Sequence, residues 1–478
     1  NKSMSLATLL SQDVYRHQYG LKHINTINND GFSALFVVNT PVFDNSGVAH
    51  AVEHMVFRAS MAFPQPESLF QLTALTDVKI NASTFANNTY YHCQSQCPKT
   101  FILAINYLLN GLLNPVFHAK YLSCEIHDGE AKGVIYRELL GAEQEQSQKT
   151  NNQAEYCYGG VSISIGKLSL NDLTSFHQKF YHPRNITLVT ANANIEQISK
   201  LISALPMQKN QVAVDINTYN KKPQDGNNDS NQQKKYPQEI NKLITVYQQW
   251  LQDPYHQEID DYIDVESSNK PQVTYTNTLQ TFSDCSLIAP LTSLSNNLNK
   301  TPFNEKASNA RVKQATSKKS LPSLFTKLYQ EAKSLLNQPM SSERMAYASD
   351  KDNALWLAQI EVAEQKLANI ASFIISAHPI FLAPRCQGQC YAIQALTIDN
   401  SSYLAIYSAF DITPESRLKK ISSYLLTLSQ DISFINECLP LAKIKYCRAK
   451  LVEINQVNDI APIHISAYLQ KLANRSSF

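Results

Sequence analysis

The hydrophobic pattern of residues 1–210 alternates between two kinds of segment. Ser33–Asn39 and Ile186–Ala193 are short, nearly continuous apolar runs, as expected for buried strands. Ile102–Leu113 instead carries its apolar residues at helical spacing. Because sheets and helices bury their apolar sides against one another, this alternation predicts a layered fold that mixes α and β structure.

The last part of the chain has the same mixed character. Leu355–Ile375 carries apolar positions at helical spacing, which predicts a helix. Tyr391–Leu396 and Tyr403–Phe410 are runs of strand-forming residues that predict two paired strands. Further helices are predicted at Ser416–Leu428 and Ala442–Glu453. A second globular domain is therefore expected in this part of the chain.

The middle of the chain, residues 211–320, is different. Tyr219–Gln233 is polar and low in aromatic residues, which is typical of a disordered linker. Ile240–Leu251 has apolar residues near one helical face and predicts a single helix. The chain is therefore predicted to hold one domain at residues 1–210 and another at residues 321–478, joined by a long polar segment.

Composition narrows the class of function. Lys+Arg 42 against Asp+Glu 40 gives a net charge of +2, which argues against a nucleic-acid binder because such binding needs clustered cations. The 43% hydrophobic fraction is enough for packed cores. No apolar run reaches the roughly 18–20 residues that cross a bilayer. Nine scattered cysteines favour a reducing compartment. We expect a soluble protein of a bacterial cytoplasm or an organelle matrix, with neither nucleic acid nor membrane as a partner.

The strongest chemical signal is the string H-x-x-E-H at His50, Glu53 and His54. Residues four apart on a helix lie one turn above each other, so the two imidazoles can bind one metal ion. Two imidazoles, a carboxylate and one open position form a catalytic zinc arrangement, so zinc is the expected ion. Zinc lowers the pKa of its bound water and polarises a carbonyl. Glu53 is then expected to act as general base on this water and to return the proton to the leaving amine.

The string has two other interpretations. The histidines can be ordinary surface or helix-end residues, but the string is expected by chance only roughly 0.01 times in such a chain. A metal-storage module would use the histidines but would give Glu53 no task. Both are weaker than a hydrolase.

The motif and its flanks resemble the pitrilysin–insulysin metallopeptidases, whose motif is this inverted zincin string. The similarity is greatest to the presequence-protease branch. It extends over residues 20–200 and is carried by these segments: Ser33–Pro41, Asn45–Ala49, Asn81–Thr84, Thr89–Tyr91, Gly159–Gly160, Phe176–His177 and Phe180–Asn185. The resemblance implies an α+β fold of two metallopeptidase-like domains, each a mostly antiparallel sheet packed with helices.

A third protein ligand is still required for zinc. The segment Gly133–Glu138 matches the family's G-V-[VI]-x-x-E, so the resemblance implies Glu138 as this ligand. Chemistry alone leaves other acids open, namely Glu125, Glu130, Glu143 and Glu145. Glu130 is also a candidate for an outer partner that orients a ligand, and the other acids are expected to be mostly solvated helix carboxylates.

The resemblance also implies residues that bind substrate. Arg385 and Tyr391 match an R-x-x-G-x-x-Y motif whose Arg and Tyr bind the substrate backbone and help hold the oxyanion. Asn81 and Ala82 lie on a strand whose edge accepts an extended peptide. The alternatives are a surface arginine, a core tyrosine and an ordinary strand-end turn.

The implied function is a zinc-dependent endopeptidase that hydrolyses short unstructured peptides. Presequence proteases have four homologous domains, and only the first and last are matched here. A homodimer, as in the family's shorter two-domain branch, is one way to rebuild a closed chamber. The alternative is a catalytically impaired member that acts as a scaffold or regulatory subunit.

Overall fold

The computed structural model describes residues 8–11, 14–26, 31–130, 132–146, 157–207, 344–349, 352–398 and 403–474. The chain forms two compact units. Unit 1 comprises residues 1–43, 78–115 and 171–282, and unit 2 comprises residues 44–77, 116–170 and 283–478. The predicted polar linker and the predicted helix Ile240–Leu251 lie outside the described residues, and the predicted domain boundaries stay a prediction.

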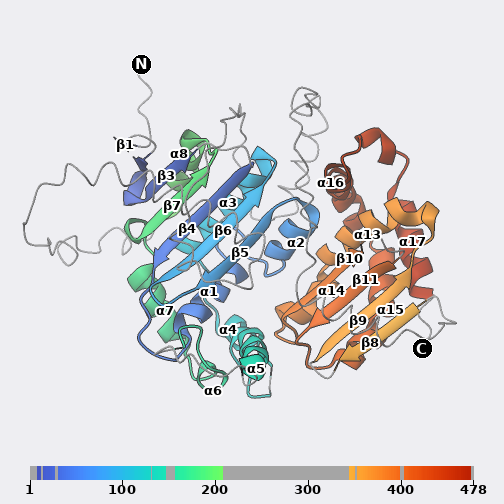
Figure 1. Cartoon of the computed structure of the whole chain (residues 1–478), viewed down its shortest axis with the longest axis horizontal. Helices are drawn as coiled ribbons and strands as arrows, with labels where there is room; N and C mark the ends of the chain where they lie inside the picture. Colours follow the sequence, from blue (N-terminus) through green and yellow to red (C-terminus); the bar gives the residue numbers. More distant parts are fainter. Residues whose placement is uncertain are drawn as a thin grey trace, which may run out of the picture. The chain divides into compact units, whose positions relative to one another are not determined.

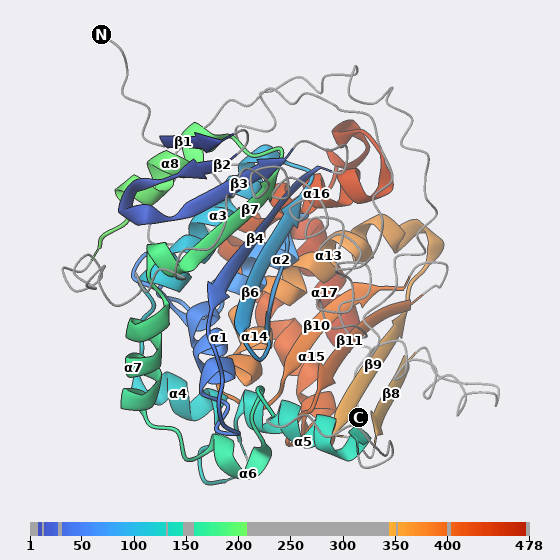
Figure 2. The same ribbon diagram turned by 60° about the vertical axis from the view of Figure 1, so that its left-hand side comes forward.

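Unit 1 is built on a seven-stranded sheet (Figures 1 and 2). In spatial order its strands are β1 (Thr8–Ser11), β2 (Val14–Arg16), β3 (Lys22–Thr26), β7 (Ile186–Ala191), β4 (Phe32–Asn39), β6 (Asn88–Ser95) and β5 (Lys79–Thr84). Every neighbouring pair is antiparallel except β3 and β7. Strand β5 pairs with β6 and forms one edge of the sheet.

The apolar runs explain the centre of this sheet. β4 lies between β7 and β6 and is buried along almost its whole length, so a continuous apolar run is favoured there over an alternating one. α3 (Pro98–Leu113) contacts β4, β6 and α8 (Ile195–Ala204), and most of its residues are buried. The unit also contains α7 (Leu170–Phe180) and the short 3-10 turns Gln18–Gly20 and Pro183–Asn185.

Unit 2 combines helices from the first half of the chain with a second sheet. Its early helices are α1 (Val48–Arg58), α2 (Ser68–Leu75), α4 (Ala119–Glu125), α5 (Val134–Gln146) and α6 (Ser162–Ile165). The antiparallel sheet has the order β10 (Ala392–Thr397), β11 (Tyr403–Ala409), β9 (Asn353–Gln359) and β8 (Arg344–Ser349). Its other elements are Val362–Glu364 (3-10), α13 (Gln365–Ala377), α14 (Pro379–Cys386), α15 (Pro414–Gln430), α16 (Ile432–Lys450), Ile454–Val457 (3-10) and α17 (Pro462–Asn474).

Both sheets confirm the predicted α+β class with mostly antiparallel strands. The expected pair of strands near the C-terminus is present as β10 and β11. The prediction of one helix over Leu355–Ile375 was wrong, because its first part is strand β9 and the helix begins only at Gln365. β9 lies between β11 and β8 and is buried at six of its seven positions, so its apolar run came from two buried faces of a strand.

Helix α16 also differs from its prediction. It begins at Ile432 and ends at Lys450, where Leu451 takes a left-handed conformation with φ of 56°. Within the described part of the chain, no single helix is long and apolar enough to cross a membrane, and one pair, Val362–Ala377 with Pro379–Cys386, meets the length and composition only with a 44° bend.

Candidate metal centre

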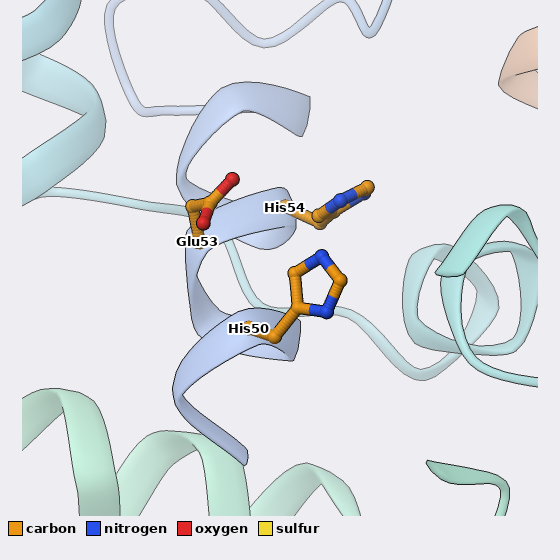
Figure 3. A group of neighbouring side chains, drawn as sticks. All are labelled: His50, Glu53 and His54. Atoms are coloured by element: carbon orange, nitrogen blue, oxygen red, sulfur yellow. The ribbon is translucent and has the colours of Figure 1, made fainter. Parts of the chain in front are cut away.

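The H-x-x-E-H string lies on α1, a helix most of whose residues are buried. Figure 3 shows the rings of His50 and His54 one turn apart on the same side of this helix, with Glu53 on the adjoining side. The ring centroids of the two histidines are 4.9 Å apart. One ligand atom from each of the three side chains lies within 4.8 Å of the others, so the cluster is compact enough to share one ion.

Glu138, on α5, faces both imidazoles. Its Oε2 lies 3.6 Å from His50 Nε2 and 3.5 Å from His54 Nε2. This oxygen is buried and has no hydrogen-bond partner among the described residues. Ligands on a tetrahedral zinc ion with bonds of about 2.1 Å lie about 3.4 Å apart. Two nitrogens and a carboxylate oxygen at this separation therefore fit a zinc ion, since a buried oxygen without a hydrogen bond is otherwise costly.

The other nitrogen of each imidazole is already engaged. His50 Nδ1 donates to the carbonyl of Gly159 at 2.9 Å, and His54 Nδ1 donates to Glu125 Oε2 at 3.0 Å. A neutral imidazole has one N–H, so donation from Nδ1 leaves the lone pair on Nε2. Both Nε2 lone pairs are thereby directed to the side where Glu138 lies, which is how outer partners commonly orient metal ligands.

Glycines hold the Gly159 carbonyl in place. Gly47 precedes α1 with φ of 77°, and Gly160 has φ of 87°. Their backbones lie so close that a Cβ on Gly160 would be 2.6 Å from Gly47 Cα. Asn45 Oδ1 accepts from the backbone N–H of Cys157 at 2.7 Å and ties the two loops together. The Gly159–Gly160 pair noted in the sequence thus acts through its backbone.

Glu125, at the end of α4, is 1% exposed and lies among cations. Its Oε1 accepts from Arg58 Nη1 at 2.5 Å and from Arg385 Nη1 at 3.3 Å. Burial raises the pKa of Glu125, but the charge of Arg385, the hydrogen bond from His54 and the charge of Arg58 outweigh it and hold the pKa below its usual range. Glu125 is therefore an ionised buried carboxylate.

The cluster also changes the acid–base state of the other side chains. Burial lowers the pKa of His54, but its contacts with Glu125 and Glu138 outweigh burial and raise this pKa to about 10. Burial raises the pKa of Glu138, but the charge of His50 and the contacts with both imidazoles lower it overall. Both carboxylates are therefore ionised and stabilise positive charge at the imidazoles, which a metal ion on the two Nε2 atoms would supply in place of a proton.

The remaining predicted acids are not at the centre. Glu130 is on the surface with a side chain that is 78% exposed, 3.4 Å from Lys132 Nζ. The carboxylate that contacts a ligand is thus Glu125, and the expected orienting role for Glu130 was wrong. Glu143 accepts from the backbone and side chain of Ser162. The side chain of Glu145 lies outside the described residues.

The predicted substrate-binding residues occupy three places. Arg385, on α14, contacts Glu125 and lies over the ring of Phe70, with 5.4 Å between Cζ and the ring centroid. Tyr391 precedes β10 and packs edge-on against Phe410. Asn81 and Ala82 belong to unit 1, on the edge strand β5. Their roles in substrate binding stay predictions.

Sequence reasoning missed Arg58 and underestimated Glu125. Arg58 follows His54 by four residues, so it lies on the same face of α1, and this spacing was the available signal. Nothing in the sequence pairs these positions with Glu125, since the two partners are 67 and 71 residues apart along the chain.

The part of the chain that carries the candidate metal centre matches a protein-family model. Residues 43–156, which include both histidines, Glu53 and Glu138, match the model described as "Insulinase (Peptidase family M16)". Over these residues the chain is similar to the pitrilysin/insulysin type of peptidase. The relatives it matches include the mitochondrial presequence proteases of Candida albicans, 30% identical over 198 residues, and of Saccharomyces cerevisiae, 27% identical over 210 residues.

These matches cover only part of this chain and only part of each relative. They cover 35% and 38% of this chain, and 18% and 20% of the two relatives. Among solved structures, the chain is similar to pitrilysin, with 13% identity, coverage of 99% of this chain and 45% of that one, and a TM-score of 0.31.

Proposed function

We propose that this chain is a zinc-dependent endopeptidase that hydrolyses short unstructured peptides. The observation that supports it is the orphaned Oε2 of Glu138, which faces the Nε2 atoms of His50 and His54 at 3.5–3.6 Å. These three atoms would hold the zinc ion. Both Nδ1 atoms donate to oxygen acceptors. The Nε2 atom of each ring is therefore the one left to bind a metal ion.

The chain's own residues would then carry the proton transfers. Zinc, when bound, supplies a Lewis acid that lowers the pKa of water and polarises a carbonyl oxygen. Glu53 is 7% exposed and adjoins the histidines. Its carboxylate takes a proton from the attacking water as the C–O bond forms. It then delivers that proton to the amine nitrogen as the C–N bond breaks.

The edge strand β5 supports the choice of an extended peptide as substrate. β5 pairs with β6 on one side and ends the sheet on the other within the described residues. An unpaired strand edge can bind a peptide main chain without reading much sequence. Asn81 and Ala82 lie on this strand.

We also propose a homodimer, and a bacterial cytoplasm or organelle matrix as the compartment.

The decisive experiment combines metal analysis with peptide cleavage. The purified chain is expected to hold one zinc ion and to cleave an unstructured peptide of a few tens of residues, with loss of activity on chelation and recovery on adding zinc. Glu53→Gln is expected to keep its zinc and to lose at least ~100-fold in kcat, the usual scale for a general base. Zinc binding without cleavage of any peptide pool would instead favour the scaffold or regulatory subunit.

A further inference from the structure

The carboxylate of Glu125 joins three helices of unit 2. His54 and Arg58 come from α1, Glu125 ends α4, and Arg385 lies in the last turn of α14. Oε2 accepts from His54, while Oε1 accepts from both arginines. Arg58 also donates through Nη2 to the carbonyl of Cys386. One buried group thereby ties the metal-binding helix to a segment more than 320 positions later in the sequence.

Aromatic rings hold the two guanidinium groups over this carboxylate. Arg58 lies over the ring of Tyr121, with Cζ 5.1 Å from the centroid, and Arg385 lies over Phe70 at 5.4 Å. The side chain of Arg58 is 4% exposed and that of Arg385 is 13% exposed. Charges as buried as these need specific partners, since their loss of hydration is otherwise large.

The two histidines differ in what holds them. His50 donates to a neutral carbonyl, whereas His54 donates to a carboxylate that two arginines also bind. An imidazole that donates to a carboxylate is a more basic ligand and is fixed in orientation. The arginines in turn fix where that carboxylate lies. Arg385 therefore has a role at the His54 side that needs no substrate.

We propose that Arg385 and Arg58 are positioning residues that act through Glu125 to hold His54 for metal binding. This inference rests on the proposed zinc site. It gives Arg385 a task different from the substrate contact that the sequence motif implies. Zinc affinity, and not only turnover, then depends on a residue of α14.

The test measures zinc affinity by competition with a chelator, using zinc alone as the probe. Glu125→Gln keeps the size of the side chain but removes its charge, and it is expected to weaken zinc binding 10–100-fold, the scale found for outer partners of metal ligands. Arg385→Gln is expected to weaken it about tenfold, at the lower end of that range. Arg385→Lys keeps the charge and should fall between this variant and the wild type.

Arg417→Gln is the matched control. The Arg417 side chain is 3% exposed, against 13% for Arg385, and it pairs with Asp411 at 2.8 Å but contacts neither histidine. It is expected to lower the melting temperature while zinc affinity stays within twofold of wild type. If Arg417→Gln weakened zinc binding as much as Arg385→Gln, the effect would be general destabilisation and the proposal would fail.

The outcomes separate this inference from the proposed function. A wild-type chain that binds no zinc overturns both. Tight zinc binding by the wild type, with equal affinity in Glu125→Gln, overturns only the positioning network. If Arg385→Gln or Arg385→Lys raised KM for a peptide without changing zinc affinity, Arg385 would act on substrate and the proposal for it would be wrong.

Discussion

At the scale of single residues, the candidate centre depends on a carboxylate oxygen that has no hydrogen-bond partner among the described residues. Glu138 Oε2 is buried and faces two imidazole nitrogens at distances longer than a hydrogen bond. An unsatisfied buried carboxylate oxygen costs free energy, and a cation shared with the histidines would offset that cost. Glu143, one helical turn and one residue further along α5, has instead a complete set of neutral partners in Ser162.

The comparison of Glu138 with Glu143 gives a direct prediction. Glu138→Gln removes a charged ligand and is expected to weaken zinc binding by more than ~100-fold, beyond the range of outer partners. Glu143→Gln, on the same helix, is expected to leave zinc affinity unchanged. Isothermal titration with zinc measures both. Equal affinities in the two variants would remove Glu138 from the metal site.

The site was predictable from the sequence to the extent that it is local. His50, Glu53 and His54 share a few turns of one helix, so their juxtaposition follows from helical geometry alone. Glu125 could not be ranked in this way, because its burial depends on the packing of α4 against α1 and on charges that come from α14. Arg58 lies four residues after His54, and this spacing is visible in the sequence. The spacing indicates a role for Arg58 only once Glu125 is known to lie beside it.

At the scale of elements, the loops around α1 determine where the histidines point. The Gly47 and Gly160 backbones approach closely, and this contact places the Gly159 carbonyl on His50 Nδ1. The sequence revealed the glycine pair but not its partner, because backbone contacts leave no pattern in side-chain hydrophobicity. The misassigned Leu355–Ile375 shows the same limit, since apolar runs of a doubly buried strand and of a buried helix look alike.

Substitution of these glycines tests the close approach. Gly160→Ala adds a Cβ at 2.6 Å from Gly47 Cα in a left-handed conformation, so both strain and a clash are expected. Gly129→Ala has a similar φ of 89° but open space around the added Cβ, and it should lose only the conformational part, about 1–2 kcal/mol. We expect Gly160→Ala to lose a further ~1–3 kcal/mol in urea unfolding and to bind zinc more weakly. Equal losses in the two variants would show that the close approach does not matter.

At the scale of the whole molecule, unit 1 contains several buried histidines that are neutral at pH 7. His17 Nε2 and His23 Nδ1 share one hydrogen bond of 2.8 Å, and both side chains are almost fully buried. Burial lowers the pKa of His17 to about 4 and also lowers that of His23. Since imidazoles in the unfolded chain take up protons at a pKa near 6.5, unit 1 should lose stability in mild acid.

His177 allows this acid sensitivity to be tested at one position. Its Nε2 donates to the carbonyl of Leu112 at 2.7 Å, and burial lowers its pKa to about 4 despite that bond. The folded pKa lies below the unfolded one, so the stabilisation is complete above about pH 6.5 and is lost as the pH falls toward 4. The loss from this one group approaches about 1.4 kcal/mol per pH unit and is on the order of 3 kcal/mol in total.

In His177→Gln the amide can still donate to Leu112, but no group titrates at this position. The free energy of urea unfolding is measured at several pH values in this window. It should fall less steeply with acid than in the wild type, with a slope that is smaller by up to about 1.4 kcal/mol per pH unit, the value for one proton. Because His17 and His23 remain in the variant, some acid sensitivity should persist. Identical slopes for the two proteins would mean that folding does not lower the pKa of His177, and a flat profile in the variant would contradict the expected contribution of the His17–His23 pair.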